Sequence, residues 1–250
     1  MHGTTPFGSI HRFLYRLRRP FDLVPYLGTG KRCPVCKHNS TRFAPLRNRK
    51  RKNARCVWCG SLERHRLIWL FFQRKTDLGD GRQKTMLHFA PEPAFIDPLS
   101  KSIGHGYVTA DLDADAMVRV DITNVAFPKD SFDIVYCCHV LEHIVDDVKA
   151  IRELSRVLKN DGWALIVVPI SRERTYEDKT ILDAAGRLAA FGQRDHARRC
   201  GLDYVERLAN NGFIVEQYSR NDVATKSEQE LFGLIDETLY YCRKHVAACA

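Results

Sequence analysis

The segment SFDIVYCCHVLEH, residues 131–143, joins an apolar run to a group of titratable side chains. Its apolar part, Phe132 to Cys137, has the length and the β-branched content of a buried strand. Strands that are apolar on both faces are typical of parallel sheets covered by helices. Ligands of such sheets bind beyond the carboxyl ends of the strands. The residues from His139 onward are therefore predicted to line a binding site.

Segments of the same kind alternate with helical patterns from Lys84 onward, which predicts an α/β domain with a parallel sheet. Helices are expected over Asp147–Leu158, ended by Gly162, and over Asp203–Asn210. The other expected strands, the last two of them closing the sheet, are Thr85–Phe89, Tyr107–Ala110, Met117–Val120, Trp163–Val168, Phe213–Tyr218 and Glu237–Arg243.

Acidic residues follow two of these strands at the edge where a ligand would bind. Asp111 follows the second strand, where a carboxylate can accept hydrogen bonds from both hydroxyls of a ribose. Asp121 follows the third and can accept from the exocyclic amine of an adenine, with Ile122 offering a backbone amide and an apolar face. Each Asp taken alone is equally typical of a turn or a helix cap. Together they favour an adenosine site.

Two CxxC pairs, Cys33/Cys36 and Cys56/Cys59, are separated by 19 residues. Each pair can supply two thiolates from one tight turn, and two such turns complete the tetrahedral shell that zinc requires. Four unligated thiols or a redox dithiol fit this spacing less well. A structural zinc ribbon is therefore predicted, followed by a helix over Leu62–Arg74 with Ser61 as its N-cap.

For each of two basic segments, the sequence is compatible with two different roles. The run from Arg47 to Arg55 can grip phosphate or form a solvated loop, and the absence of interleaved aromatic residues favours the loop. Residues 8–19 have the pattern of a basic amphipathic helix, which can dock on the protein itself or lie on an anionic membrane.

The composition is that of a folded chain: 44% of the 250 residues are hydrophobic, and 39 Lys and Arg oppose 30 Asp and Glu. This excludes collagen-like, coiled-coil and disordered classes. The net charge of +9 favours acidic partners without selecting one. The longest apolar stretch is too short to span a bilayer, and no signal core is apparent, so a cytoplasmic protein with reduced cysteines is expected.

The predicted organisation has four parts. A basic amphipathic segment occupies residues 1–30, the zinc ribbon residues 31–61, a connecting helix and linker residues 62–83, and the α/β domain residues 84–250.

Three linked motifs of the α/β domain resemble the class I S-adenosylmethionine-dependent methyltransferases. They are VDITNVAFP (120–128) with SFDIV (131–135), HVLEHI (139–144) and ELSRVLK (153–159). The resemblance covers residues 84–244 and implies a Rossmann-like, seven-stranded methyltransferase sheet whose last strand is antiparallel. It implies S-adenosyl-L-methionine as cofactor, with Asp111 on the ribose, Asp121 on the adenine amine and His139 facing the methyl group.

The loop after the first strand, FAPEP (89–93), departs from this family because it has no glycine. Ala90 is small enough for a close approach of the ligand, but two prolines remove two amide donors. This loop, residues 60–66 and the FGQRDH segment (191–196) together resemble a bacterial subgroup of the family that carries the same ribbon. The cofactor-binding residues implied by the resemblance are Phe89, Ala90, Glu92, Asp111, Leu112, Asp121, Ile122 and His139.

The segment 191–199 lies where substrate-covering insertions occur in such sheets. His196 is the first candidate for a general base and Asp195 for its orienting partner, although local packing of His196 is equally compatible with the sequence. Arg194, Arg198 and Arg199 can bind an acidic group of the acceptor or remain solvated. His139 completes the candidate catalytic residues.

These features favour a methyltransferase acting on a small-molecule or glycan-related acceptor. Two alternatives stay open: an RNA methyltransferase that grips RNA through the basic ribbon, and a non-catalytic zinc-ribbon interaction protein with a degenerate cofactor site. The oligomeric state and a peripheral membrane contact through residues 8–19 are not determined by the sequence.

Overall fold

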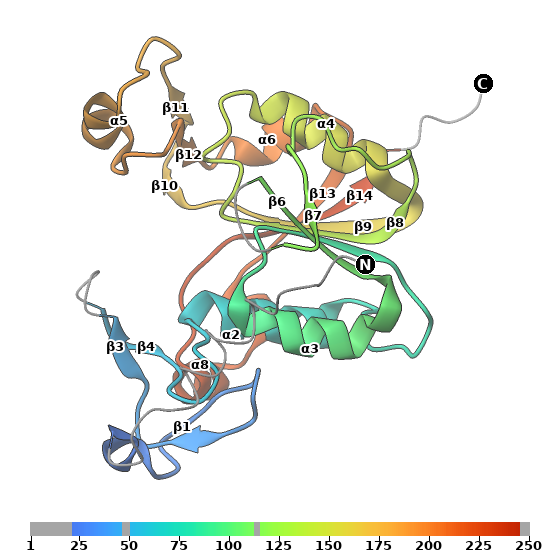
Figure 1. Ribbon diagram of the computed structural model, residues 1–250. Coiled ribbons are helices and arrows are strands. Elements are labelled where there is room, and N and C mark those ends of the chain that lie inside the picture. The colour runs from blue at the N-terminus through green and yellow to red at the C-terminus, as the bar shows by residue number, and fades with distance from the viewer. Residues whose placement is uncertain (1–21, 47–50, 113–115, 246–250) are drawn as a thin grey trace, which may run out of the picture.

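A computed structural model describes residues 22–46, 51–112 and 116–245 (Figure 1). Its centre is a seven-stranded sheet with the strand order β13-β14-β9-β8-β5-β6-β7. Strands β5 to β9 are parallel to one another, whereas β14 is antiparallel to both β9 and β13. This is the α/β methyltransferase sheet that the motifs predicted. Its strands are β5 (Met86–Phe89), β6 (Tyr107–Asp111), β7 (Val118–Arg119), β8 (Phe132–Cys138), β9 (Leu158–Val167), β13 (Phe213–Tyr218) and β14 (Leu239–Lys244).

Helices cover both faces of the sheet (Figure 1). On one face lie α4 (Asp147–Val157) and α6 (Tyr204–Ala209); on the other lie α2 (Glu63–Lys75), α3 (Pro93–Ile103) and α8 (Lys226–Phe232). Short helical turns complete the chain: η2 (Val24–Tyr26), η4 (Gly104–Gly106) and α7 (Arg220–Val223).

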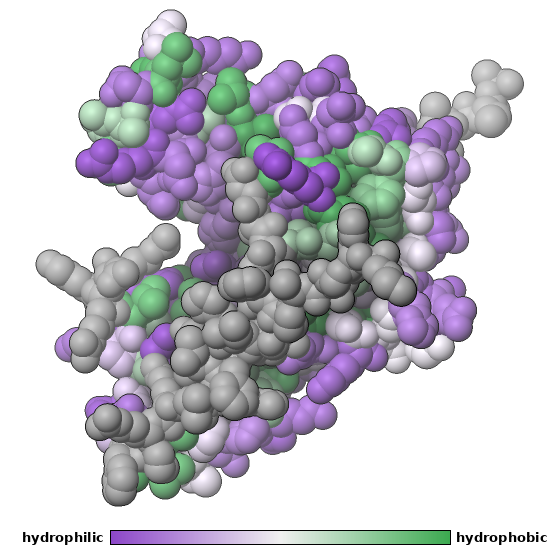
Figure 2. Space-filling model, viewed as in Figure 1, coloured by the Kyte–Doolittle hydropathy of each residue, from purple (hydrophilic) through white to green (hydrophobic). Residues whose placement is uncertain are grey.

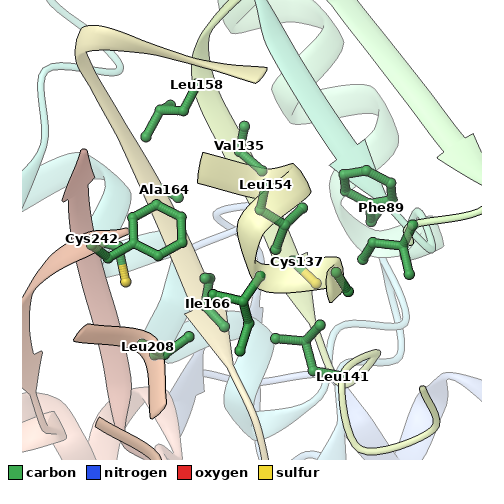
Figure 3. Close-up of a cluster of buried hydrophobic side chains, with 14 of the residues drawn as sticks. Phe89, Val135, Cys137, Leu141, Leu154, Leu158, Ala164, Ile166, Leu208 and Cys242 are labelled. Atoms are coloured by element: carbon green, nitrogen blue, oxygen red, sulfur yellow. The ribbon is translucent and has the colours of Figure 1, made fainter. Parts of the chain in front are cut away.

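The sheet is apolar on both faces because each face has its own core. Figure 3 shows part of the first, in which Leu154 of α4 and Leu208 of α6 approach Val135 of β8 and Ile166 of β9. All four side chains are fully buried. In the second core, helix α2 contributes an almost continuous apolar run from Leu67 to Phe72. Burial on both faces explains why these strands read as unbroken apolar segments.

Two predicted helix boundaries were wrong. Helix α4 ends at Val157, and Gly162 lies inside β9 rather than after the helix. A Cβ at Gly162 would stand 2.5 Å from the carbonyl oxygen of Asp133, so the glycine permits a close approach of two strands. Helix α2 has Leu62 as its N-cap residue, while the Ser61 hydroxyl contacts cysteine sulfurs of the ribbon.

A small insertion follows β9 and projects beyond the carboxyl edge of the sheet (Figure 1). It forms a three-stranded sheet with the order β10-β12-β11, in which β12 is parallel to β10 and antiparallel to β11. Its elements are β10 (Ile170–Arg172), β11 (Tyr176–Glu177), α5 (Ala184–Phe191) and β12 (Arg198–Gly201). The segment that the sequence placed over the substrate therefore belongs to this insertion.

The amino-terminal ribbon consists of two antiparallel hairpins. They pair β1 (Lys31–Arg32) with β2 (Asn39–Ser40) and β3 (Ala44–Leu46) with β4 (Arg51–Arg55). The ribbon packs beside α2 and α8 (Figure 1). The amphipathic helix expected over residues 8–19 lies outside the described residues. Within the described ranges, no helix combines the length and the apolarity needed to cross a membrane.

Candidate active site and cysteine cluster

The register of the parallel strands aligns the candidate cofactor loops at one edge of the sheet. Phe89 of β5 pairs with Ala110 of β6 and with Cys137 of β8, and Ala110 pairs with Val118 of β7. The loops that begin with Ala90, Asp111 and His139 therefore leave the sheet within two residues of the same level. This is the edge where an open α/β sheet binds its ligand.

The first loop takes a glycine-like conformation without a glycine. Ala90 has a φ of 47°, in the left-handed region, and its amide donates to the carbonyl oxygen of Ala110 at 2.9 Å. Phe89, one residue earlier, is buried in the core. A small residue held in this conformation lets a ligand approach the backbone closely, which is the role that glycine has in such loops. The loop therefore fits a cofactor despite its sequence.

The Glu92 carboxylate is buried beneath this loop, where it contacts buried side chains of the domain. The Tyr136 hydroxyl donates to its Oε2 at 2.8 Å, and Nε2 of His65 lies 3.2 Å from its Oε1. Burial raises the pKa of Glu92, but the hydrogen bonds and charges of His65 and His88 outweigh this and leave the pKa well below its usual range. The carboxylate is thus ionised and committed to a buried network.

The residues after β6 and β7 occupy three different environments. Asp111 is half-buried at the end of its strand, and Leu112 beside it is exposed. Asp121 is exposed, and its Oδ1 accepts from the amide and the hydroxyl of Thr123 at 2.8 and 2.9 Å. The turn-forming role considered for Asp121 is therefore present. Ile122 packs its side chain into the core of the sheet.

His139 follows β8 and is held between two carboxylates. Its Nδ1 lies 3.0 Å from Glu142 Oε1, and its Nε2 lies 3.5 Å from Glu237 Oε1. Burial alone would lower the pKa of His139, but the two neighbouring carboxylates have the larger, opposite effect and raise this pKa to about 9. This pKa favours the protonated ring at neutral pH, a form suited to donating hydrogen bonds rather than to accepting a proton.

The insertion places His196 against the loop after β8, the loop that also carries His139. His196 is buried, and its ring meets that of His143 edge to face with centroids 4.7 Å apart. Burial lowers the pKa of His196, and the neighbouring His143 lowers it further, which favours the neutral ring. Asp195 does not orient His196 as predicted: its Oδ2 lies 3.3 Å from Nδ1 of His143. Sequence reasoning missed this pairing because the two residues are 52 positions apart.

Arg198 is a structural residue rather than an exposed cation for an acidic acceptor. Its side chain is 1% exposed and donates to the carbonyl oxygens of Leu141, Ile144 and Val145 at 2.6–3.0 Å. It also pairs with Asp147 at 3.2 Å. Arg198 thus fixes the loop after β8 to the insertion.

The four cysteines of the ribbon have the geometry of a tetrahedral zinc site. The Sγ atoms of Cys33 and Cys59 are 3.7 Å apart, as are those of Cys36 and Cys56. Four sulfurs bonded to zinc at 2.3 Å are about 3.8 Å apart. The two turns are also alike: the residue after each second cysteine, Lys37 or Gly60, has a positive φ, and its amide donates to the first cysteine's carbonyl. The donor set therefore fits zinc.

A buried arginine lies beside this cluster. Arg66 of α2 is fully buried, and its guanidinium donates to the carbonyl oxygens of Ala54 and Ser61 in the ribbon and of Phe232 and Gly233 at the end of α8. It also stacks over the Phe43 ring at 3.8 Å. Its positive charge complements four thiolates around a divalent ion.

The comparisons with known proteins agree with the fold. Residues 95–166 match the family model described as a methyltransferase domain. An uncharacterized methyltransferase, YcgJ of Bacillus subtilis, is 35% identical over 156 residues, which cover 60% of this chain and 58% of the relative. Ajmaline N-methyltransferase of Rauvolfia serpentina is 29% identical over 143 residues, covering 53% of this chain and 49% of the relative. The chain thus spans about half the length of these curated relatives.

Among solved structures, an S-adenosylmethionine-dependent methyltransferase from Mesorhizobium loti aligns with a TM-score of 0.51 at 13% identity, covering 71% of this chain and 98% of that one. Likeness at this identity supports the fold alone. The sheet, the family match and the relatives together support an α/β methyltransferase fold, and they do not identify an acceptor.

Proposed function

We propose that this chain is an S-adenosylmethionine-dependent methyltransferase acting on a small-molecule or glycan-related acceptor. The observation that carries the proposal is the strand register, which aligns the loops after β5, β6 and β8 at one edge. The sequence match to a methyltransferase domain covers part of these loops. When bound, the cofactor would supply a methyl group already activated by its sulfonium.

The chain's own residues would bind and orient the two substrates. The Asp111 carboxylate would accept hydrogen bonds from the ribose hydroxyls, and the left-handed Ala90 would let the backbone approach the ligand. Asp121 would use the carboxylate oxygen that does not bond Thr123. His196, which is buried and has a lowered pKa, is the candidate base for an acceptor that must lose a proton.

The insertion supports a small acceptor. Figure 2 shows hydrophobic side chains among hydrophilic ones on the insertion, at the upper left, and an indented outline between the insertion and the ribbon. The exposed apolar residues of the insertion include Tyr176, Leu182 and Leu188. Leu182, with Val145 and Ile181, lines a small hollow on the insertion, and apolar side chains in a hollow are typical of small-molecule sites. The relative named ajmaline N-methyltransferase also has a small-molecule acceptor in its name.

Zinc in the ribbon would have a structural role. Four cysteines occupy all four positions of a tetrahedral ion, so no open position remains for a reacting group. The ribbon is joined to α2 and to the end of α8 through Arg66. Zinc would therefore stabilise the docking of the ribbon on the transferase domain.

Calorimetric titration with S-adenosylmethionine tests the proposed cofactor site. Wild-type protein should bind it, and Asp111→Asn should bind about 10–100-fold more weakly, because a hydrogen bond to a charged group contributes about 1.5–3 kcal/mol. Asp161→Asn, which changes an exposed acid within β9, is the matched control and should bind like wild type. Absence of binding in folded, zinc-loaded wild type would overturn the proposal. Salt-sensitive retention on immobilised RNA would instead favour an RNA acceptor.

A further inference from the structure

We propose that Glu142, His143 and His196 form a second metal site, for a divalent transition-metal ion, distinct from the cysteine cluster. One ligand atom from each of the three residues lies within 4.8 Å of the others. Two imidazoles and one carboxylate are a donor set of open metal centres, in which the protein leaves coordination positions for other ligands. Among the described residues, two groups of potential metal ligands have their ligand atoms this close together: this cluster and the four cysteines.

The state of the Glu142 carboxylate points to a cation. The residue is 1% exposed, and its Oε2 is buried without a hydrogen-bond partner among the residues that the structure describes. The other oxygen, Oε1, already lies 3.0 Å from Nδ1 of His139. A buried, unpaired carboxylate oxygen is strongly destabilising, and a metal ion would satisfy it.

The surrounding residues form the outer contacts that metal ligands usually have. Asp195 pairs with Nδ1 of His143, which leaves Nε2 of that ring available as a ligand atom. His139 holds one oxygen of Glu142 and so orients the other. Carboxylates behind ligating histidines, and donors behind ligating carboxylates, fix the tautomer and the direction of each ligand.

The scaffold holds the two halves of the site together. The Ala197 amide donates to the Glu142 carbonyl at 2.8 Å, directly joining the insertion to the loop after β8. The buried Arg198 binds three carbonyl oxygens of the same loop. Ligands bonded to one ion at about 2.0–2.2 Å are about 3–4 Å apart, so the side chains must close slightly. His143, whose side chain is 33% exposed, has the freedom to do so.

An ion at this position would face the edge where the acceptor is expected. Its open positions would take an oxygen donor such as a hydroxyl of the acceptor, which narrows the acceptor class to hydroxyl compounds. With the ion bound, the metal would promote loss of the hydroxyl proton, and His196 would act as a ligand instead of as the base. This extension rests on the proposed function. Metal binding itself does not, and it can be measured in protein that has no methyl donor.

Equilibrium dialysis of the full chain against a low concentration of free Zn²⁺, followed by metal analysis, tests the site. Wild type should hold two zinc ions per chain, one in each cluster. Glu142→Gln and His143→Asn should hold one, with the second ion bound about 100-fold more weakly, since even outer residues of metal sites contribute 10–100-fold. His105→Asn, an exposed histidine in η4, is the control and should hold two.

Circular dichroism and thermal unfolding of each variant separate lost ligation from lost folding. His143 is the decisive position because its partial exposure makes misfolding of the variant least expected. Wild type holding a single zinc, or folded His143→Asn holding two, overturns the inference. Loss of S-adenosylmethionine binding with both metals retained would contradict only the proposed function.

Discussion

Replacing Arg66 by Met tests whether the buried guanidinium joins the ribbon to the transferase domain. The substitution keeps most of the apolar stem but removes the donors to four carbonyl oxygens, two in the ribbon and two at the end of α8. Leaving one buried polar group without a partner costs about 1–3 kcal/mol, and removing one member of a buried charged network costs about 3–5 kcal/mol in total. We therefore expect a loss of about 4 kcal/mol in the free energy of unfolding.

Thermal and urea unfolding of zinc-loaded protein measure this loss. For a chain of this size, 1 kcal/mol shifts the melting temperature by about 2–4 °C, so Arg66→Met should melt about 8–16 °C below wild type. Arg74→Met is the matched control, since Arg74 is on the same helix but is partly exposed. It donates to a single carbonyl oxygen, that of Val223, and pairs with Glu228 at the surface, where such pairs contribute less than about 1 kcal/mol. If the two variants lose the same small amount, Arg66 does not join the two parts.

Three further predictions concern the ribbon, the first loop and the insertion. Chelation of zinc, or Cys36→Ser, should lower the melting temperature together with the zinc content, and restoring zinc should reverse only the chelation. Ala90→Val should cost about 1–3 kcal/mol and weaken cofactor binding, because a β-branched residue is strained at positive φ, whereas Ala90→Gly should stay within about 1 kcal/mol of wild type by calorimetry and unfolding. Burial raises the pKa of Glu177, but Arg207 and Arg198 lower it more, so the net pKa is depressed. Its stabilisation is present above about pH 4.5 and lost as pH falls, and Glu177→Gln should remove that part of the pH dependence of unfolding; an unchanged profile would contradict the assignment.

The sequence was sufficient for the sheet because its strands are buried on both faces and read as apolar runs, as in Phe132–Cys138. It was also sufficient for the cysteine cluster, since each CxxC turn is a local structure. The sequence did not predict the role of side chains that bind a partner far away along the chain. The Ser61 hydroxyl contacts the sulfur of Cys33, 28 positions away, rather than capping α2, and Arg198 binds carbonyl oxygens more than 50 positions away. Such contacts depend on tertiary packing, which no local pattern encodes.

The contacts of Arg66 also bear on the order in which the chain assembles. Two of its acceptors, Phe232 and Gly233, are 166 and 167 positions further along the polypeptide. During synthesis the ribbon therefore leaves the ribosome well before the carbonyls that complete its attachment. Native docking of the ribbon must wait until the end of α8 has emerged, and a nascent chain stopped before Phe232 would leave this guanidinium without half of its acceptors.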